Sequence, residues 1–139
     1  IVWFIDPAHE RLSDLVQRMA ETARTMLHGV AYEFKQTGDF HASHLPLDFR
    51  RNVLPIFKEA LHNAIKHSGA TRLAIHVRRW GDWFQVVVED NGGGFAPEQA
   101  GKGNGLMNMQ RRAAEMKADL AIRSRPGEGT TVTLTARIP

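Results

Sequence analysis

Apolar residues recur at the spacing of an amphipathic α-helix in three segments of the chain. Asp6 and Pro7 supply an N-cap and a first-turn proline for the first segment, and Gly29 ends it. Pro55 lies inside the second segment without interrupting its periodicity. The pattern therefore predicts three helices, which cover about residues 7–28, 47–67 and 104–117.

Elsewhere apolar and polar positions alternate, as they do in half-buried β-strands. This alternation predicts five strands, over residues 30–36, 72–80, 83–90, 120–125 and 131–138. Gly81 and Asp82 form a tight hairpin turn between the second strand and the third. The order of elements predicts an α+β fold in which helices cover one face of a sheet with much antiparallel pairing.

The composition narrows the class of protein. The chain has 139 residues, which suits one domain with its own core, and it has no cysteine for disulfides or thiolate metal sites. No apolar run approaches the roughly 18 residues of a membrane helix. The net charge is +3, and the basic residues are scattered along the chain without a cluster. We therefore expect a modest attraction for anions and no nucleic-acid partner. Because the chain starts at Ile1 without a Met, we expect a longer parent protein.

The predicted helix over residues 47–67 has two distinct faces. Its apolar face is formed by Leu54, Phe57, Leu61, Ala64 and Ile65. Glu59, Asn63 and Lys66 lie together on roughly the opposite side, at separations of four and three residues. A polar column of this kind is most often a solvated face, so a functional interpretation needs support from another part of the chain.

Two glycine clusters supply that support. Gly92, Gly93 and Gly94 follow a predicted strand and its terminal Asp90, and a second cluster over residues 101–106 opens the third helix. Glycine lets the backbone approach a ligand closely, and the free N–H groups of a helix N-terminus attract phosphate. Neither cluster has the spacing of a P-loop or of a dinucleotide fingerprint. A different nucleotide-binding architecture is therefore needed.

Four motifs in a fixed order resemble the ATP-binding domain of the GHKL superfamily. They are the N box EALHNAIKHSGA, the first glycine box EDNGGGF, the second glycine box GKGNGL and the closing segment GEGTTVTL. More narrowly, VWFIDP, KEALHNAIKHSGA and GLMNMQRRAAEM resemble bacterial sensor histidine kinases whose dimerisation hairpin carries a His-Asp phosphoacceptor motif. The resemblance implies a two-layer α/β sandwich of the Bergerat type. It also implies that residues 1–8 are the tail of the dimerisation module and that residues 9–139 form the ATP-binding domain.

The resemblance implies ATP and Mg²⁺ as ligands and assigns an adenine pocket. Asp90 would accept a hydrogen bond from the adenine amino group, which selects adenine because guanine presents a carbonyl acceptor at that position. Gly92 and Gly94 would let the purine lie against the backbone. Thr130 would support the same pocket.

The resemblance places the phosphates beside the polar column. Asn63 would hold Mg²⁺ through its side-chain oxygen, and Glu59 would lie near the γ-phosphate and help position the attacking imidazole or a metal-bound water. Lys66 and His67 would contact phosphate, under a short lid formed by residues 95–102. The residues of the second glycine box that would wrap the phosphates are Gly103, Asn104, Gly105 and Leu106.

The implied reaction transfers the γ-phosphoryl group of Mg-ATP to a histidine on the dimerisation module, for relay to an aspartate of a response regulator. His9, His28 and His62 lack the sequence surroundings of an acceptor, so this chain alone is expected to bind nucleotide only. The parent is expected to be a homodimer with its catalytic part in the cytoplasm, and the fragment a monomer. The alternatives are a GHKL ATPase, an anti-sigma-type serine kinase and a binding module that has lost ATP.

Overall fold

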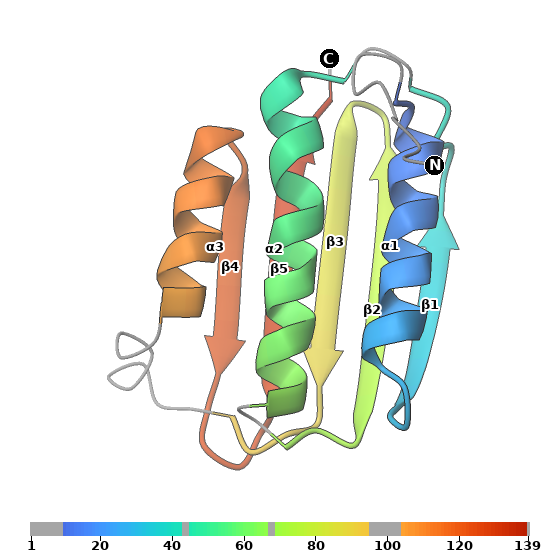
Figure 1. Ribbon diagram of the computed structural model, residues 1–139. Coiled ribbons are helices and arrows are strands. Elements are labelled where there is room, and N and C mark those ends of the chain that lie inside the picture. The colour runs from blue at the N-terminus through green and yellow to red at the C-terminus, as the bar shows by residue number, and fades with distance from the viewer. Residues whose placement is uncertain (1–9, 43–44, 67–68, 95–103, 139) are drawn as a thin grey trace, which may run out of the picture.

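The computed structural model describes residues 10–42, 45–66, 69–94 and 104–138. Its elements follow the predicted order (Figure 1). They are α1 (Leu12–Met26), β1 (Ala31–Thr37), α2 (Leu47–Lys66), β2 (Arg72–Trp80), β3 (Trp83–Asp90), α3 (Asn104–Glu115), β4 (Asp119–Ser124) and β5 (Thr130–Arg137). The bounds predicted for β2 and β3 are confirmed residue for residue, and α2 continues through Pro55 as predicted.

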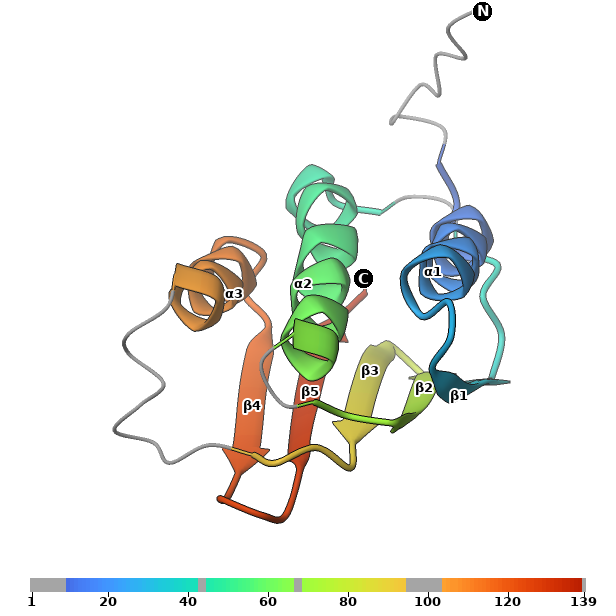
Figure 2. The ribbon, with the colours of Figure 1, turned by 60° about the horizontal axis from the view of Figure 1, so that its bottom comes forward.

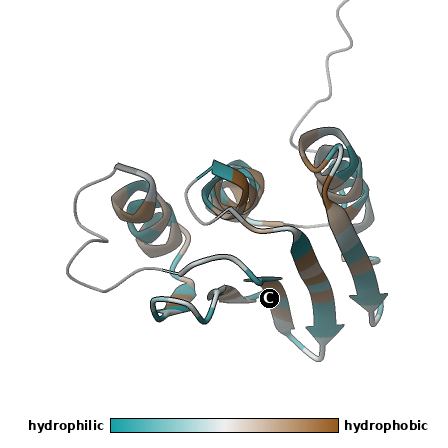
Figure 3. Ribbon diagram, turned by 90° about the horizontal axis from the view of Figure 1, so that it is seen from below, coloured by the Kyte–Doolittle hydropathy of each residue, from teal (hydrophilic) through white to brown (hydrophobic). Residues whose placement is uncertain are grey.

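The five strands form one sheet in the order β1-β2-β3-β5-β4. β1 pairs with β2 in parallel, and the other three pairings are antiparallel. The three helices lie side by side over one face of this sheet (Figures 1 and 3). The predicted α+β fold, with helices on one face of a mostly antiparallel sheet, is confirmed.

Alternation along the strands builds the core between the sheet and the helices. In β2 the buried residues are Leu73, Ile75 and Val77, and the residues between them lie on the other face. Phe57 of α2 is 2% exposed and meets Phe34 of β1 edge to face, with ring centroids 6.4 Å apart. Burial of these apolar side chains is the main stabilising term of the fold.

Helix α1 begins later than predicted. Arg11 has extended backbone angles and caps α1, so this helix starts at Leu12 and not at Pro7; the expected Asp6 cap lies outside the described residues. The Arg11 N–H donates to Asp14 at 3.0 Å, and the Leu12 N–H donates to the Ala42 carbonyl at 2.9 Å. These contacts, rather than the Asp-Pro signal, determine where the helix starts.

Helix α3 ends before Lys117, the predicted last residue. Lys117 has a φ of 57°, in the left-handed region that helices cannot continue through. The Ala118 N–H donates to the Ala113 carbonyl at 2.8 Å, which closes the last turn and leads the chain into β4.

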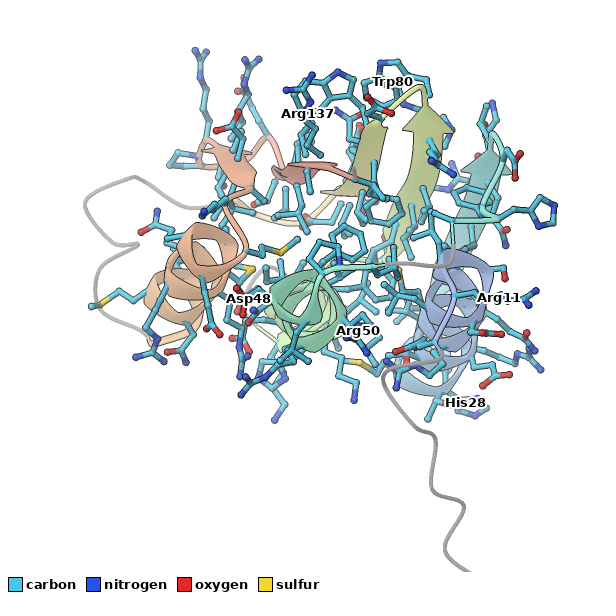
Figure 4. The ribbon with its side chains drawn as sticks, turned by 90° about the horizontal axis from the view of Figure 1, so that it is seen from above. Arg11, His28, Asp48, Arg50, Trp80 and Arg137 are labelled. Carbon is cyan, nitrogen blue, oxygen red and sulfur yellow. The ribbon has the colours of Figure 1, made fainter. Side chains whose placement is uncertain are left out.

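The sheet face opposite the helices carries two exposed aromatic side chains. Trp80 and Trp83 flank the β2–β3 turn and are 44% and 40% exposed. The guanidinium carbon of Arg78 lies 4.8 Å from the Trp80 ring centroid, and that of Arg137 lies 5.4 Å from the Trp83 centroid. Figure 4 shows Trp80 and Arg137 on the side of the sheet away from the helices. These cation–π contacts cover ring faces that would otherwise be open to water.

Within the described ranges, no helix combines the length and the apolar composition that a membrane crossing requires.

Two methionines of α3 provide a matched test of the core. Met109 is fully buried, whereas Met107 is 61% exposed. Met109→Ala should lower the free energy of unfolding by about 2–5 kcal/mol, because it removes buried atoms and leaves a cavity. Met107→Ala should change it by less than about 0.5 kcal/mol. Urea unfolding of both variants measures the difference, and equal costs would contradict this placement of α3.

Candidate functional site

The predicted site residues that the structure describes gather at one end of the domain. The C-terminal ends of α2 and β3 lie there together with the N-terminal end of α3 (Figures 1 and 2). β5 begins at the same end, because it runs antiparallel to β3. Segments that are far apart in the sequence therefore converge on one region.

Asp90 closes β3 and is 9% exposed. Its carboxylate Oδ1 accepts the Gly92 N–H at 2.8 Å, which bends the chain sharply after the strand. Thr130 is the partner of Asp90 in the pairing of β3 with β5. The Thr130 hydroxyl itself lies 2.8 Å from the Ser124 hydroxyl. Asp90 is thus a buried acid held by local backbone and by sheet register.

Asn91 has a structural role that the sequence patterns did not reveal. Its Oδ1 accepts the N–H groups of Thr71 at 3.0 Å and Arg72 at 2.9 Å, and its Nδ2 donates to the Thr71 hydroxyl at 3.0 Å. These bonds tie the turn after β3 to the segment that leads from α2 into β2. The available signal was an Asn after a strand, which indicates a turn but no partner.

Two glycines let the loops at this end pack together. Gly94 and Gly129 both have positive φ, 64° and 78°. A Cβ at Gly94 would overlap the Arg125 carbonyl, and one at Gly129 would overlap the Asp90 carbonyl. Close packing of the backbone therefore requires glycine at both positions, whether or not a ligand is present.

Two residues of the polar column of α2, Glu59 and Asn63, face α3. A Cβ built on Gly105 would overlap Oε1 of Glu59 and lie 3.4 Å from Oδ1 of Asn63. Glu59 and Asn63 are half-buried, whereas Lys66, at the end of α2, is exposed. The structure therefore brings Glu59 and Asn63 together with Gly105.

Of the remaining predicted residues, some lie in the first turn of α3 and the others lie outside the described residues. Leu106 is half-buried with its side chain packed on the core, so its predicted ligand contact would come from the backbone. Asn104 is the first residue of α3. His67, Gly103 and the predicted lid lie outside the described residues.

This arrangement suits an anionic ligand that carries a metal ion. The first turn of α3 has N–H groups without partners in the helix, and the helix dipole favours negative charge there. Glu59 and Asn63 place hard oxygen donors beside that turn, and Mg²⁺ prefers such donors together with phosphate oxygens. The side chains present therefore fit a magnesium-bound polyphosphate.

Comparison with known proteins identifies the family. The model of the histidine kinase-, DNA gyrase B-, and HSP90-like ATPase family matches residues 50–139, and the chain belongs to this family. The superfamily recognised from the motifs is therefore confirmed, and with it ATP as the nucleotide of this class of domain.

The similar proteins are named as sensor kinases. The chain is 31% identical to the histidine-protein kinase/phosphatase DegS of Brevibacillus brevis over 79% of this chain and 28% of that protein. It is 34% identical to the sensor histidine kinase LnrJ of Bacillus subtilis over 88% of this chain and 28% of that protein. The chain thus spans less than a third of these relatives.

Solved structures support the fold. The histidine kinase domain of the Erythrobacter litoralis EL346 blue-light activated histidine kinase superimposes with a TM-score of 0.70 at 19% identity. The match covers 97% of this chain and 66% of that one. At this identity the comparison shows a common fold and nothing further.

Gly129 and Gly127 give a matched test of the packing beside Asp90. Both have positive φ, but a Cβ at Gly127 meets nothing within 4 Å. Alanine should cost about 1–2 kcal/mol at either position through the left-handed backbone. Gly129→Ala should cost at least about 1 kcal/mol more, because the end of β3 must move. Urea unfolding measures both, and an equal loss would contradict the described contact with Asp90.

Proposed function

We propose that this chain is the ATP-binding catalytic domain of a two-component sensor histidine kinase. The observation that carries the proposal is the approach of α3 to α2, which places Gly105 against Glu59 and Asn63. Asp90 lies buried at the same end of the domain. The names of the relatives support a kinase over the other outputs of this family.

Asp90 is the proposed adenine determinant. A carboxylate has two oxygens with several lone pairs, so the bond from the Gly92 N–H is compatible with a second donor. The exocyclic amine of adenine is such a donor. Guanine would turn a carbonyl oxygen toward the carboxylate, and two acceptors that face each other cost affinity. Gly92, Gly94 and Thr130 form the backbone and hydroxyl surroundings of this pocket in the proposal.

The proposed phosphate site lies between α2 and α3. Asn63 and the nucleotide phosphates would share a Mg²⁺ ion, which neutralises charge on the phosphates when it is bound. The backbone amides of Gly103 to Leu106 would donate to phosphate oxygens. Lys66 and His67 would add positive charge at the end of α2, where Lys66 is exposed and free to reach outward.

The proposed reaction is phosphoryl transfer to a histidine outside this chain. An imidazole nitrogen attacks the γ-phosphorus, the bond from that phosphorus to the β–γ bridging oxygen breaks, and ADP leaves. Glu59 would orient the attacking imidazole, and catalysis would come mainly from positioning and charge neutralisation. The acceptor would belong to the dimerisation module of a homodimeric parent, with a response-regulator aspartate as the next acceptor.

The adenine assignment is tested with a pair of acidic neighbours. Asp90 is buried, whereas Glu89 is exposed on the opposite face of β3. Asp90→Asn should weaken Mg-ATP binding about tenfold or more, because a hydrogen bond to a charged group is lost. Glu89→Gln, which removes the same charge, should leave binding within about twofold. Isothermal titration calorimetry gives both dissociation constants.

Titration of the unaltered chain with GTP completes this test. GTP should bind at least about 100-fold more weakly than ATP. Equal affinity for the two nucleotides, or an equal effect of the two substitutions, would remove Asp90 from the base pocket.

A further inference from the structure

Helices α2 and α3 run antiparallel and meet at two levels. At the level of the candidate site, Gly105 lies against Glu59. At a second level, Arg112 Nη1 donates to Asn52 Oδ1 at 3.1 Å. Arg112 follows Gly105 by seven residues, and Asn52 precedes Glu59 by seven, so the two contacts lie two turns apart, about 10.5 Å along each helix.

Asn52 is a buried amide whose orientation is fixed. It is 1% exposed, and its Nδ2 donates to the Asp48 carbonyl one turn earlier at 2.8 Å. This bond to its own helix leaves Oδ1 directed at α3, where Arg112 donates to it. Both polar atoms of a buried side chain are thus satisfied, which is the condition for tolerating an amide in an apolar interface.

The Arg112–Asn52 bond adds a directional contact to the apolar packing of α3. Met109 and Ala113 are buried and hold α3 close to α2 and the sheet. Apolar packing of this kind has no preferred bond direction, whereas a hydrogen bond joins two particular atoms. A shift by one residue would move α3 about 1.5 Å along its axis and displace Gly105 from Glu59.

We propose that the Arg112–Asn52 hydrogen bond is a positioning contact that sets the axial position of α3 on α2. Through it, the N-terminal amides of α3 are held at the correct distance from Glu59 and Asn63. This inference rests on the proposed nucleotide site. Arg112 acts through α3 and touches no ligand, since it lies two turns from the phosphate end of the helix.

A positioning role has a distinct signature in ligand affinity. Contacts to the phosphates depend on where α3 begins, whereas contacts to the base depend on Asp90 at the end of β3. Loss of the Arg112 contact should therefore weaken Mg-ATP and leave adenosine nearly unaffected. A general loss of stability would lower the affinities for Mg-ATP and adenosine to a similar extent.

The experiment compares Arg112→Met with Arg111→Met in the whole chain. Arg111 is the exposed neighbour whose guanidinium bonds to Asn108 of its own helix, so this control removes the same charge from the same helix. Competition against a fluorescent ATP analogue gives the dissociation constants of Mg-ATP and adenosine. Arg112→Met should weaken Mg-ATP about tenfold and adenosine less than about twofold. Arg111→Met should change neither by more than about twofold.

A double-substitution cycle separates positioning from stability. Asn52→Leu should reproduce the selective loss of Mg-ATP affinity. The double variant with Arg112→Met replaces both polar partners by apolar side chains and should recover stability in urea. The affinity of the double variant for Mg-ATP should stay about as low as that of either single variant, because the two single variants and the double variant all lack the same Arg112–Asn52 hydrogen bond.

The outcomes distinguish this inference from the proposed function. If the unaltered chain binds Mg-ATP and Arg112→Met binds it equally well, the positioning role is overturned and the proposed function stands. Parallel losses of Mg-ATP and adenosine affinity also overturn it. An unaltered chain that binds no Mg-ATP contradicts the proposed function itself and removes the basis of the inference.

Discussion

The close packing of α3 on α2 is the contact on which the candidate site depends. Helix α2 packs on the sheet with its apolar side and on α3 with the side that carries Glu59 and Asn63. Glycine at position 105 is what lets the first turn of α3 come this close, since a side chain there would occupy the place of the Glu59 carboxylate. The positive end of one helix dipole thereby meets two oxygen-bearing side chains of another helix.

The two halves of the site differ in how firmly the fold holds them. Asp90 belongs to a central strand paired on both sides, and Asn91 fastens the turn that follows it. In our proposal, the phosphate half depends instead on the placement of one helix, through packing and the Arg112–Asn52 bond. Recognition of the base would then be rigid, while contact with the phosphates could respond to small movements of α3.

Regular patterns in the sequence predicted most of the fold. The strands β2 and β3 alternate cleanly around a two-residue turn, so their bounds were predicted to the residue. The motif order assigned Glu59, Asn63 and Gly105 to one phosphate site, and the structure brings these three residues together. Periodicity and motif order work where a local pattern and the tertiary fold agree.

Contacts between distant residues could not be predicted in this way. The predicted start of α1 was wrong because the helix begins where the Arg11 N–H bonds to Asp14 and the Leu12 N–H bonds to the distant Ala42 carbonyl. The partners of Asn91 lie 19 and 20 residues away in the sequence, and Arg112 lies 60 residues from Asn52. Single polar contacts over such separations leave no periodic trace.

A crystal structure of this chain with Mg²⁺ and a non-hydrolysable ATP analogue tests the central claim most directly. The account predicts the adenine amino group within hydrogen-bond distance of the Asp90 carboxylate, the metal ion on Oδ1 of Asn63, and phosphate oxygens at the amides that open α3. A nucleotide bound at any other surface, or one whose phosphates point away from α2 and α3, would contradict it.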